Sequence, residues 1–146
     1  MLVTGNPGLS LEEQKSHFAL WCIMSSPLFL GNDPRNITPE EKAIITNELA
    51  IAINQDPAEQ GKRVKVDGKT EVWAKKLKDG NMAVLLLNRD TIKTKNVEIA
   101  MQELGLSVNV KLLNVYTSEY LGIAKKTISY KLKAQTGIFL LIECEN

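Results

Sequence analysis

The stretch SSPLFLGNDPRNITPEE, residues 25–41, holds the pattern that decides the fold. Its apolar run, residues 27–30, is too short for a helix and predicts a buried strand. Asn32 and Asp33 follow as a polar tip, and TPEE (38–41) then provides a helix start, with a threonine to cap it and a proline in its first turn. A strand, a polar tip and a capped helix in this order indicate the βα rhythm of a parallel sheet.

One more helix is predicted, before this stretch. SLEE, residues 10–13, is a capping box in which Ser10 caps the helix and Glu13 reaches back. Each helix carries an apolar stripe that should face a core. The first stripe is Leu11, Phe18, Trp21, Cys22 and Met24, and the second, on one continuous helix, is Ile44, Ile45, Leu49 and Ile53. Residues 1–56 therefore read as α/β: strand stub, helix, strand, helix.

From residue 57 the periodicity of apolar residues changes to that of β-strands. Asp67-Gly68 predicts a hairpin turn, residues 78–81 predict another, and residues 82–89 predict a central strand buried on both faces. Four further apolar segments follow, separated by turn residues. We therefore predict that residues 57–146 form an all-β domain, an antiparallel β-sandwich of Greek-key type that folds cooperatively by itself.

Composition excludes several classes of function. The chain has 146 residues, 44% of them hydrophobic and 24% charged, with a net charge of +1, so we expect neither nucleic acid nor a membrane as partner. No secretory signal is recognisable at the start, and the compartment is left open. Cys22 and Cys144 lack metal-ligand spacing and are expected to be free thiols. We predict no metal site and no cofactor.

Other polar and aromatic residues are assigned structural roles. His17 is expected at a helix surface or core edge, Trp21 and Trp73 in a core, and Asp56 in a turn before Pro57. Six lysines of the first hairpin are expected to form a solvated edge that discourages strand pairing. They are Lys62, Lys65, Lys69, Lys75, Lys76 and Lys78.

A resemblance to a known family runs in order along nearly the whole chain. The matching residues are Met1-Leu2, Gly5-Asn6, Gly8-Leu9-Ser10, Glu13-Gln14, His17-Phe18, Leu20-Trp21, Pro27-Leu28, Gly31-Asn32-Asp33, Arg35, Ile51-Ala52-Ile53-Asn54-Gln55-Asp56, Glu71-Val72-Trp73-Ala74 and Asn88-Arg89. In this pattern the chain resembles the C-terminal part of the α-galactosidase and α-N-acetylgalactosaminidase family, glycoside hydrolase family 27 of clan D.

The resemblance implies the end of a (β/α)8 barrel followed by a small antiparallel β domain. In such a fold Asn32 and Asp33 would end the last barrel strand, on the face that carries the active site. The family's two catalytic aspartates lie on earlier strands, so no residue here is expected to be catalytic. Met1 is expected to line the sugar pocket once the full barrel is supplied, and Asn6, Asn32 and Asp33 are candidates at its mouth.

Two functions follow as hypotheses. In the first, the chain is the C-terminal portion of an α-galactosidase-type retaining hydrolase, acts on an α-galactoside only within the whole enzyme, and self-associates through its barrel-helix faces. The choice among galactose, N-acetylgalactosamine and arabinopyranose would then belong to loops earlier in the barrel. In the alternative, residues 57–146 are a free-standing carbohydrate-binding or structural module. Only Tyr116, Tyr120 and Tyr130 could supply that module with an aromatic sugar-binding surface.

Overall fold

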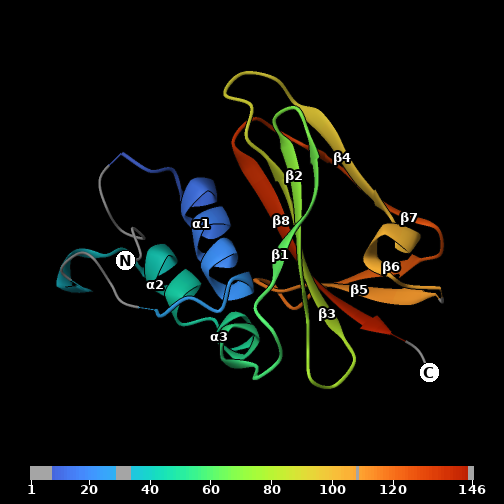
Figure 1. The fold of residues 1–146 in the computed structure, drawn as a ribbon. Helices are drawn as coiled ribbons and strands as arrows, with labels where there is room; N and C mark the ends of the chain where they lie inside the picture. The colour runs from blue at the N-terminus through green and yellow to red at the C-terminus, as the bar shows by residue number, and fades with distance from the viewer. Residues whose placement is uncertain (1–7, 29–33, 108, 145–146) are drawn as a thin grey trace.

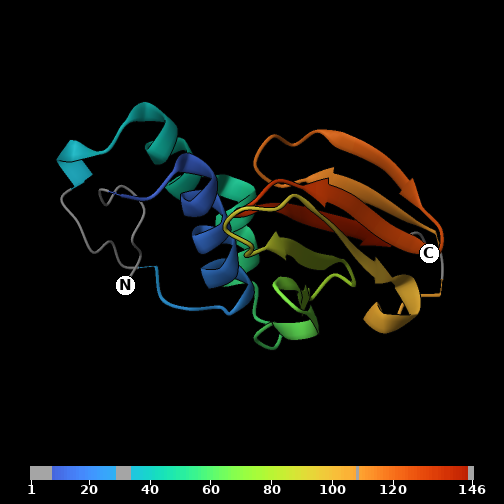
Figure 2. The ribbon, with the colours of Figure 1, turned by 90° about the horizontal axis from the view of Figure 1, so that it is seen from above.

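A six-stranded antiparallel sheet is the middle of three layers in the computed structural model, which describes residues 8–28, 34–107 and 109–144. Helices cover one face of this sheet, and a two-stranded sheet covers the other (Figure 1). The view from above separates the helices from the β-layers in the same way (Figure 2). The order of the large sheet is β1-β2-β3-β8-β5-β6, and β4 pairs with β7. The strands are β1 (Lys62–Asp67), β2 (Thr70–Lys76), β3 (Met82–Asn88), β4 (Lys95–Ala100), β5 (Val110–Asn114), β6 (Tyr120–Ala124), β7 (Thr127–Leu132) and β8 (Thr136–Cys144).

The helices begin where the capping signals predict. Helix α1 (Leu11–Ile23) has the full capping box of Ser10 and Glu13, and α2 (Pro39–Ile45) has the same arrangement at Thr38. Two short 3₁₀ helices, η1 (Pro34–Asn36) and η2 (Met101–Leu104), complete the helical elements of the described residues.

The second predicted helix is divided, which corrects the expectation of one continuous helix. Asn47 separates α2 from α3 (Glu48–Gln55), and its side chain accepts a hydrogen bond from the amide of Ala50 at 2.9 Å. The same side-chain amide donates to the carbonyls of Val115 and Tyr116, at 3.4 and 3.3 Å. A contact with the loop after β5 therefore sets the start of α3.

Alternating side chains of the two central strands supply two separate cores, because successive residues of a strand point to opposite faces. On β3, Val84 and Leu86 point toward the β4–β7 sheet, and Ala83 and Leu85 point toward the helices. On β8, Leu140 and Ile142 share the first core, and Phe139 and Leu141 share the second. The prediction of a central strand buried on both faces is confirmed, since every residue of β3 is buried.

The apolar stripes of the helices are buried against the six-stranded sheet. A barrel wall is therefore not the only surface that can bury them. Phe18 and Cys22 are both 0% exposed, and Ile44 is 2% exposed, in one core with Leu85 and Phe139. The buried face of α1 is formed by Gln14, Phe18, Ala19, Cys22 and Ile23. The predicted stripe is wrong at Leu11, which is 36% exposed, because that residue lies on the first turn of α1, outside this face.

The turns of the β-layers lie where the sequence predicts them, and the structure contains one strand that the sequence does not predict. Gly68, at φ 60°, begins the tight turn between β1 and β2, and Gly80, at φ 93°, lies in the turn between β2 and β3. Strand β6 was not predicted; it pairs with β5 and exposes Tyr120 and Ile123. Of the predicted strand at 27–30, the described residues Pro27 and Leu28 are not in regular secondary structure, and the remainder lies outside the described residues.

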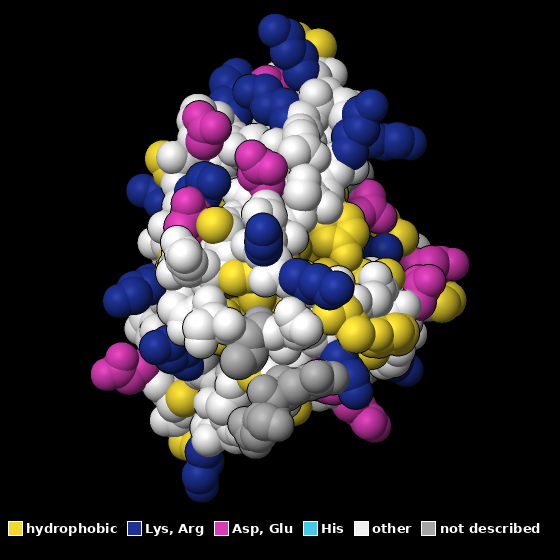
Figure 3. All heavy atoms as spheres, turned by 90° about the vertical axis from the view of Figure 1, so that its right-hand side faces the viewer, with side chains coloured by type: hydrophobic (Ala, Val, Ile, Leu, Met, Phe, Trp, Pro, Cys, Tyr) yellow, Lys and Arg dark blue, Asp and Glu magenta, His cyan; other side chains and the backbone are white. Residues whose placement is uncertain are grey.

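Among the described residues on the face that β4 and β7 present, acidic and basic side chains are interspersed over the middle, and lysine and arginine predominate toward the upper end (Figure 3). Within the described residues, no helix is long and apolar enough to cross a membrane. Short helices followed by an antiparallel β-sandwich form the architecture expected from the sequence, the last units of an α/β barrel with a C-terminal all-β domain.

Candidate functional site

The four residues predicted to contact substrate, Met1, Asn6, Asn32 and Asp33, lie outside the described residues. Their placement at a sugar pocket stays a prediction. Within residues 8–28, 34–107 and 109–144, no group of three or more histidine, cysteine, aspartate or glutamate side chains is arranged to hold a metal ion.

A groove of about 320 Å³ separates the first half of α1 from the end of β3. Glu13, His17, Arg89 and Gln135 are among its lining residues. Its histidine lies at the core edge, as predicted, with its ring 5.7 Å from that of Trp21, and partial burial lowers its pKa. Retaining glycosidases need two carboxyl groups about 5–5.5 Å apart. Of the described residues that line the groove, Glu13 alone has a carboxylate, and it caps α1, so this groove does not supply that pair.

A buried carboxylate on β2 organises a second cluster. Glu71 is 5% exposed and accepts hydrogen bonds from Arg89 and from the indole of Trp73, both at 2.9 Å, while Arg63 lies 3.9 Å away. Burial by itself raises the pKa of Glu71, but the hydrogen bonds and the two arginines outweigh it and leave that pKa below its usual value. These contacts satisfy the buried charge and fix Trp73 at the edge of the helix-side core, so the cluster is structural.

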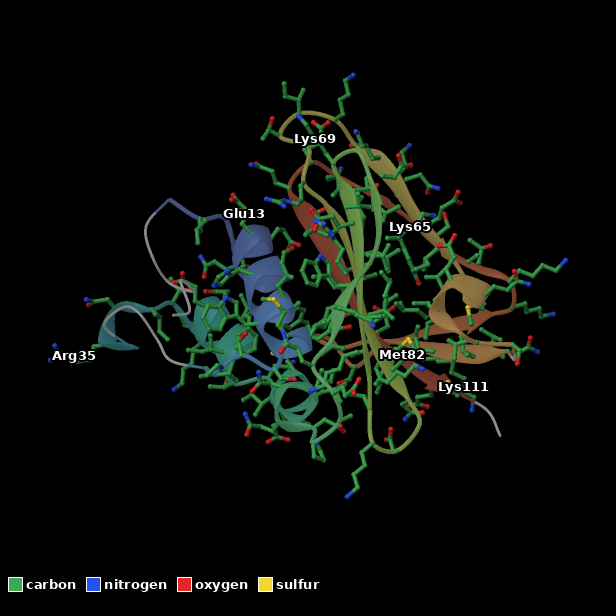
Figure 4. All side chains as sticks on the ribbon, viewed as in Figure 1. Glu13, Arg35, Lys65, Lys69, Met82 and Lys111 are labelled. Atoms are coloured by element: carbon green, nitrogen blue, oxygen red, sulfur yellow. The ribbon has the colours of Figure 1, made fainter. Side chains whose placement is uncertain are left out.

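Lys75 corrects the prediction of a solvated lysine edge. It is 1% exposed, and its Nζ donates to the Ser25 hydroxyl at 2.8 Å, the Ile53 carbonyl at 2.6 Å and the Asp56 carbonyl at 3.2 Å. Lys69, in contrast, is exposed in the turn of the hairpin, and Lys65 points toward the β4–β7 sheet, where its Nζ donates to the Glu98 carbonyl at 3.0 Å (Figure 4). Alternation explains the difference, since Lys75 shares the helix-side face of β2 with Trp73.

Further contacts close the junction around Lys75. Asn54, 5% exposed, donates to the carbonyls of Trp21 and Ser26, at 3.2 and 2.9 Å. Asp56 accepts from the amides of Ala58 and Lys78, both at 3.0 Å, which confirms its predicted role as a turn residue. The carboxyl ends of α1 and α3, the linker after α3 and strand β2 therefore meet at one buried polar point.

Gly61 allows this junction to close. Its amide donates to the Ile23 carbonyl at 2.7 Å, which ties the linker to the last residue of α1. A Cβ atom at this position would lie 2.6 Å from that carbonyl oxygen and 2.7 Å from the carbonyl oxygen of Ala74. Any side chain would force the backbone segments apart.

The thiols and aromatic residues take the structural roles expected of them. Cys22 is buried and Cys144 half-buried, and both are free, as predicted. Burial raises the pKa of Cys22 to about 12, so it is unsuited to act as a nucleophile. Trp21 and Trp73 are half-buried against the helix-side core, and the Tyr116 hydroxyl donates to the Lys15 carbonyl at 2.6 Å.

Comparison with known proteins gives this architecture a family. Residues 1–56 match the family model described as alpha galactosidase A, and residues 67–141 match the model of the alpha galactosidase C-terminal beta sandwich domain. Human alpha-galactosidase A is 43% identical over 110 residues, which cover 74% of this chain and 26% of that protein. Chicken alpha-N-acetylgalactosaminidase is 36% identical over 123 residues, 82% of this chain and 30% of that protein.

Solved structures share the fold across nearly the whole chain. Alpha-galactosidase I from Mortierella vinacea superposes with a TM-score of 0.89 at 28% identity, covering 97% of this chain and 38% of that one. A GH27 β-L-arabinopyranosidase from Geobacillus stearothermophilus also gives 0.89, at 23% identity over 94% of this chain and 31% of that one, a likeness of fold alone. The chain spans about a quarter to a third of the length of the curated relatives named here. On these matches, the chain belongs to the α-galactosidase family, glycoside hydrolase family 27.

Proposed function

We propose that this chain acts as the C-terminal part of a retaining α-galactosidase, which hydrolyses terminal α-linked galactose and is catalytic only in the presence of the preceding barrel. The observation that supports this most directly is the shared core of α1, α3 and the large sheet, in which Phe18, Leu85 and Phe139 are buried together. That core makes the helices and the sandwich one structural unit, and 97% of this chain superposes on alpha-galactosidase I from Mortierella vinacea.

The chemistry supports a dependence on the rest of the barrel. A retaining mechanism needs one carboxylate as nucleophile and one carboxyl group as acid/base. Five carboxylates of the described residues are held by hydrogen bonds within this chain. Glu71 bonds to arginine, Asp56 and Asp90 accept from backbone amides, and Glu13 and Glu41 belong to capping boxes. We therefore assign the catalytic pair to the preceding part of the enzyme.

A chimera tests this proposal. The segment of the Mortierella vinacea enzyme that superposes on this chain is replaced by residues 1–146, and hydrolysis of p-nitrophenyl α-galactoside is measured. We expect turnover by the chimera and none by the 146-residue chain alone. A folded, soluble chimera without turnover, beside an active parent enzyme, would contradict the proposal, as would turnover by the purified chain that is lost in Asp33→Asn.

Calorimetric titration of the isolated chain with methyl α-galactoside distinguishes the alternative, a carbohydrate-binding module. Tyr116 is held against Phe139 and hydrogen-bonded to α1, and Tyr130 is half-buried. Of the three tyrosines, Tyr120 alone is open, at 56% exposed, and one ring does not make an extended stacking surface. We expect no binding heat.

Sedimentation of the same sample tests whether the helix faces mediate self-association, which the partly exposed Leu11 would favour.

A further inference from the structure

The position of Lys75 is unusual because a lysine seldom lies in a protein interior without a carboxylate in direct contact. Its side chain extends from β2 into the space between the ends of two helices, and its three hydrogen-bond partners are a hydroxyl and two carbonyls. An ammonium group has three N–H donors and no acceptor. Three oxygen atoms within 3.2 Å of Nζ therefore match the charged form of the side chain.

Two of the three oxygen atoms around Lys75 are carbonyls at the carboxyl end of α3, and the Ile53 carbonyl also accepts a hydrogen bond from the Asp56 amide, at 3.4 Å. The last carbonyls of a helix need external donors, and the negative end of its dipole favours a cation. Lys75 supplies both to α3 through Ile53 and to the following turn through Asp56. Ser25, just after α1, adopts a left-handed φ of 54°, a conformation that a non-glycine residue keeps only when its surroundings hold it there.

Two titratable groups that face Lys75 oppose the effect of burial on its pKa. Burial lowers the pKa of Lys75, and the Asp56 carboxylate and the Cys22 thiol on α1 act in the opposite direction. Asp56 is itself fixed by the amides of Ala58 and Lys78. The ammonium is thus held by hydrogen bonds to three places: Ser25 just after α1, Ile53 near the end of α3, and Asp56 at the start of the linker.

We propose that Lys75 is a positioning residue through which the β-sandwich fixes the carboxyl ends of α1 and α3, and with them the point at which the chain leaves α1. Ser25 and Ser26 lead directly along the chain to residues 29–33, where the sequence places Asn32 and Asp33. Asn54 holds the Ser26 carbonyl from α3, and Lys75 holds the Ser25 hydroxyl from β2. The consequence for a substrate pocket rests on the function proposed above, but the positioning itself does not.

Amide hydrogen exchange on the 146-residue chain tests the positioning without any activity measurement. Lys75→Met keeps the length of the side chain and removes all three donors; Lys76→Met, at the exposed neighbour, is the matched control. We expect Lys75→Met to accelerate exchange at Ser25, Ser26 and Asp56 about tenfold to a hundredfold, the equivalent of one or two lost charged hydrogen bonds. Amides that pair β3 with β8 should keep their rates, and Lys76→Met should change neither set.

Two results would overturn the proposal. Unchanged exchange at Ser25, Ser26 and Asp56 in folded Lys75→Met would show that the ammonium does not fix them. Uniform acceleration that includes the β3–β8 amides would show that Lys75 supports the whole fold and positions nothing in particular.

A second measurement keeps the proposal testable if Lys75→Met does not fold. In the wild-type chain labelled with ¹⁵N-lysine, the Nζ of Lys75 should give the multiplet of a three-proton ammonium, protected from exchange with water. Ser25→Ala removes one acceptor and should speed exchange of those protons and of the Ser26 amide, with Asp56 unaffected. The absence of a protected ammonium signal, or no change in Ser25→Ala, would refute the assignment.

Discussion

The close approach at Gly61 gives the most quantitative test of how the helices join the sandwich. In Gly61→Ala, the new Cβ would lie 2.5 Å from the Ile23 side chain, 2.6 Å from the Ile23 carbonyl and 2.7 Å from the Ala74 carbonyl. Two of these are backbone atoms that no rotamer change can move. The linker must shift, and the 2.7 Å hydrogen bond from the Gly61 amide to Ile23 is lost or stretched.

The expected loss follows from these two effects. The hydrogen bond contributes about 1 kcal/mol, and forced displacement in a packed region costs about 1–3 kcal/mol, so the free energy of unfolding should fall by about 2–4 kcal/mol. With a urea m-value of about 2 kcal/mol/M, the unfolding midpoint should fall by about 1–2 M. Circular dichroism in urea measures this shift directly.

Gly105→Ala is the control, because it tests backbone conformation without a clash. Gly105 has a φ of 74°, and no atom lies within 4 Å of an added Cβ, so only the left-handed backbone cost of about 1–2 kcal/mol should appear. Hydrogen exchange should also localise the Gly61→Ala effect to α1 and the linker. If Gly61→Ala costs no more than Gly105→Ala, the close approach and the reasoning built on it are refuted.

Three further changes probe the helix layer, the acid limit and the thiols. Phe18→Ala, in the helix-side core, should cost about 3–5 kcal/mol of unfolding free energy in urea, whereas Leu11→Ala should cost less than about 1 kcal/mol; equal losses would contradict the docking of α1 on the sheet. Hydrogen bonds from backbone amides lower the pKa of Asp90 from 3.8 to about 2. The stabilisation that the ionised Asp90 gives the folded state is therefore present above pH 3.8 and is lost as the pH falls toward 2. In Asp90→Asn, the free energy of unfolding measured in urea should fall less steeply over this pH range than in the wild type. A thiol reagent at mildly alkaline pH should modify Cys144 before Cys22, whose pKa of about 12 leaves little thiolate; early labelling of Cys22 would argue against its burial.

The sequence predicts the helix starts and the turns, because these depend on residues that lie close together in the chain. The capping boxes at Ser10 and Thr38 depend on residues three positions apart, and the turn glycines depend on backbone conformation. The break at Asn47 was missed because its amide contacts carbonyls 68 and 69 positions away in sequence. Strand β6 was missed because its exposed side chains give no clear apolar alternation.

The junction at Lys75 was partly within reach of the sequence. If Trp73 faces a core, the alternation of a strand places Glu71 and Lys75 on the same face. The sequence therefore indicates that both are buried charges that need partners. It does not indicate which oxygen atoms Lys75 contacts, since Ser25 and Ile53 are 50 and 22 positions away from it. The substrate residues Met1, Asn6, Asn32 and Asp33 were assigned by family resemblance, and that assignment stays a prediction.

The two-faced sheet changes what we expect of the sandwich in isolation. From the sequence, residues 57–146 should fold cooperatively by themselves, because their strands can bury one another. In the structure that burial uses only one face, and five residues of the other face are buried with the helices: Ala83, Leu85, Leu87, Phe139 and Leu141.

A chain of residues 57–146 would present this apolar face to water, and contiguous apolar patches above a few hundred Å² are rare on monomeric proteins. We therefore expect that shortened chain to bind a hydrophobic dye and to sediment as dimers or larger species, while the same chain with Leu85→Lys and Phe139→Glu should be more soluble. A strictly monomeric, dye-free sample of residues 57–146 would show that the β-layers can close without the helices, and would favour an independent module over the terminal part of a larger enzyme.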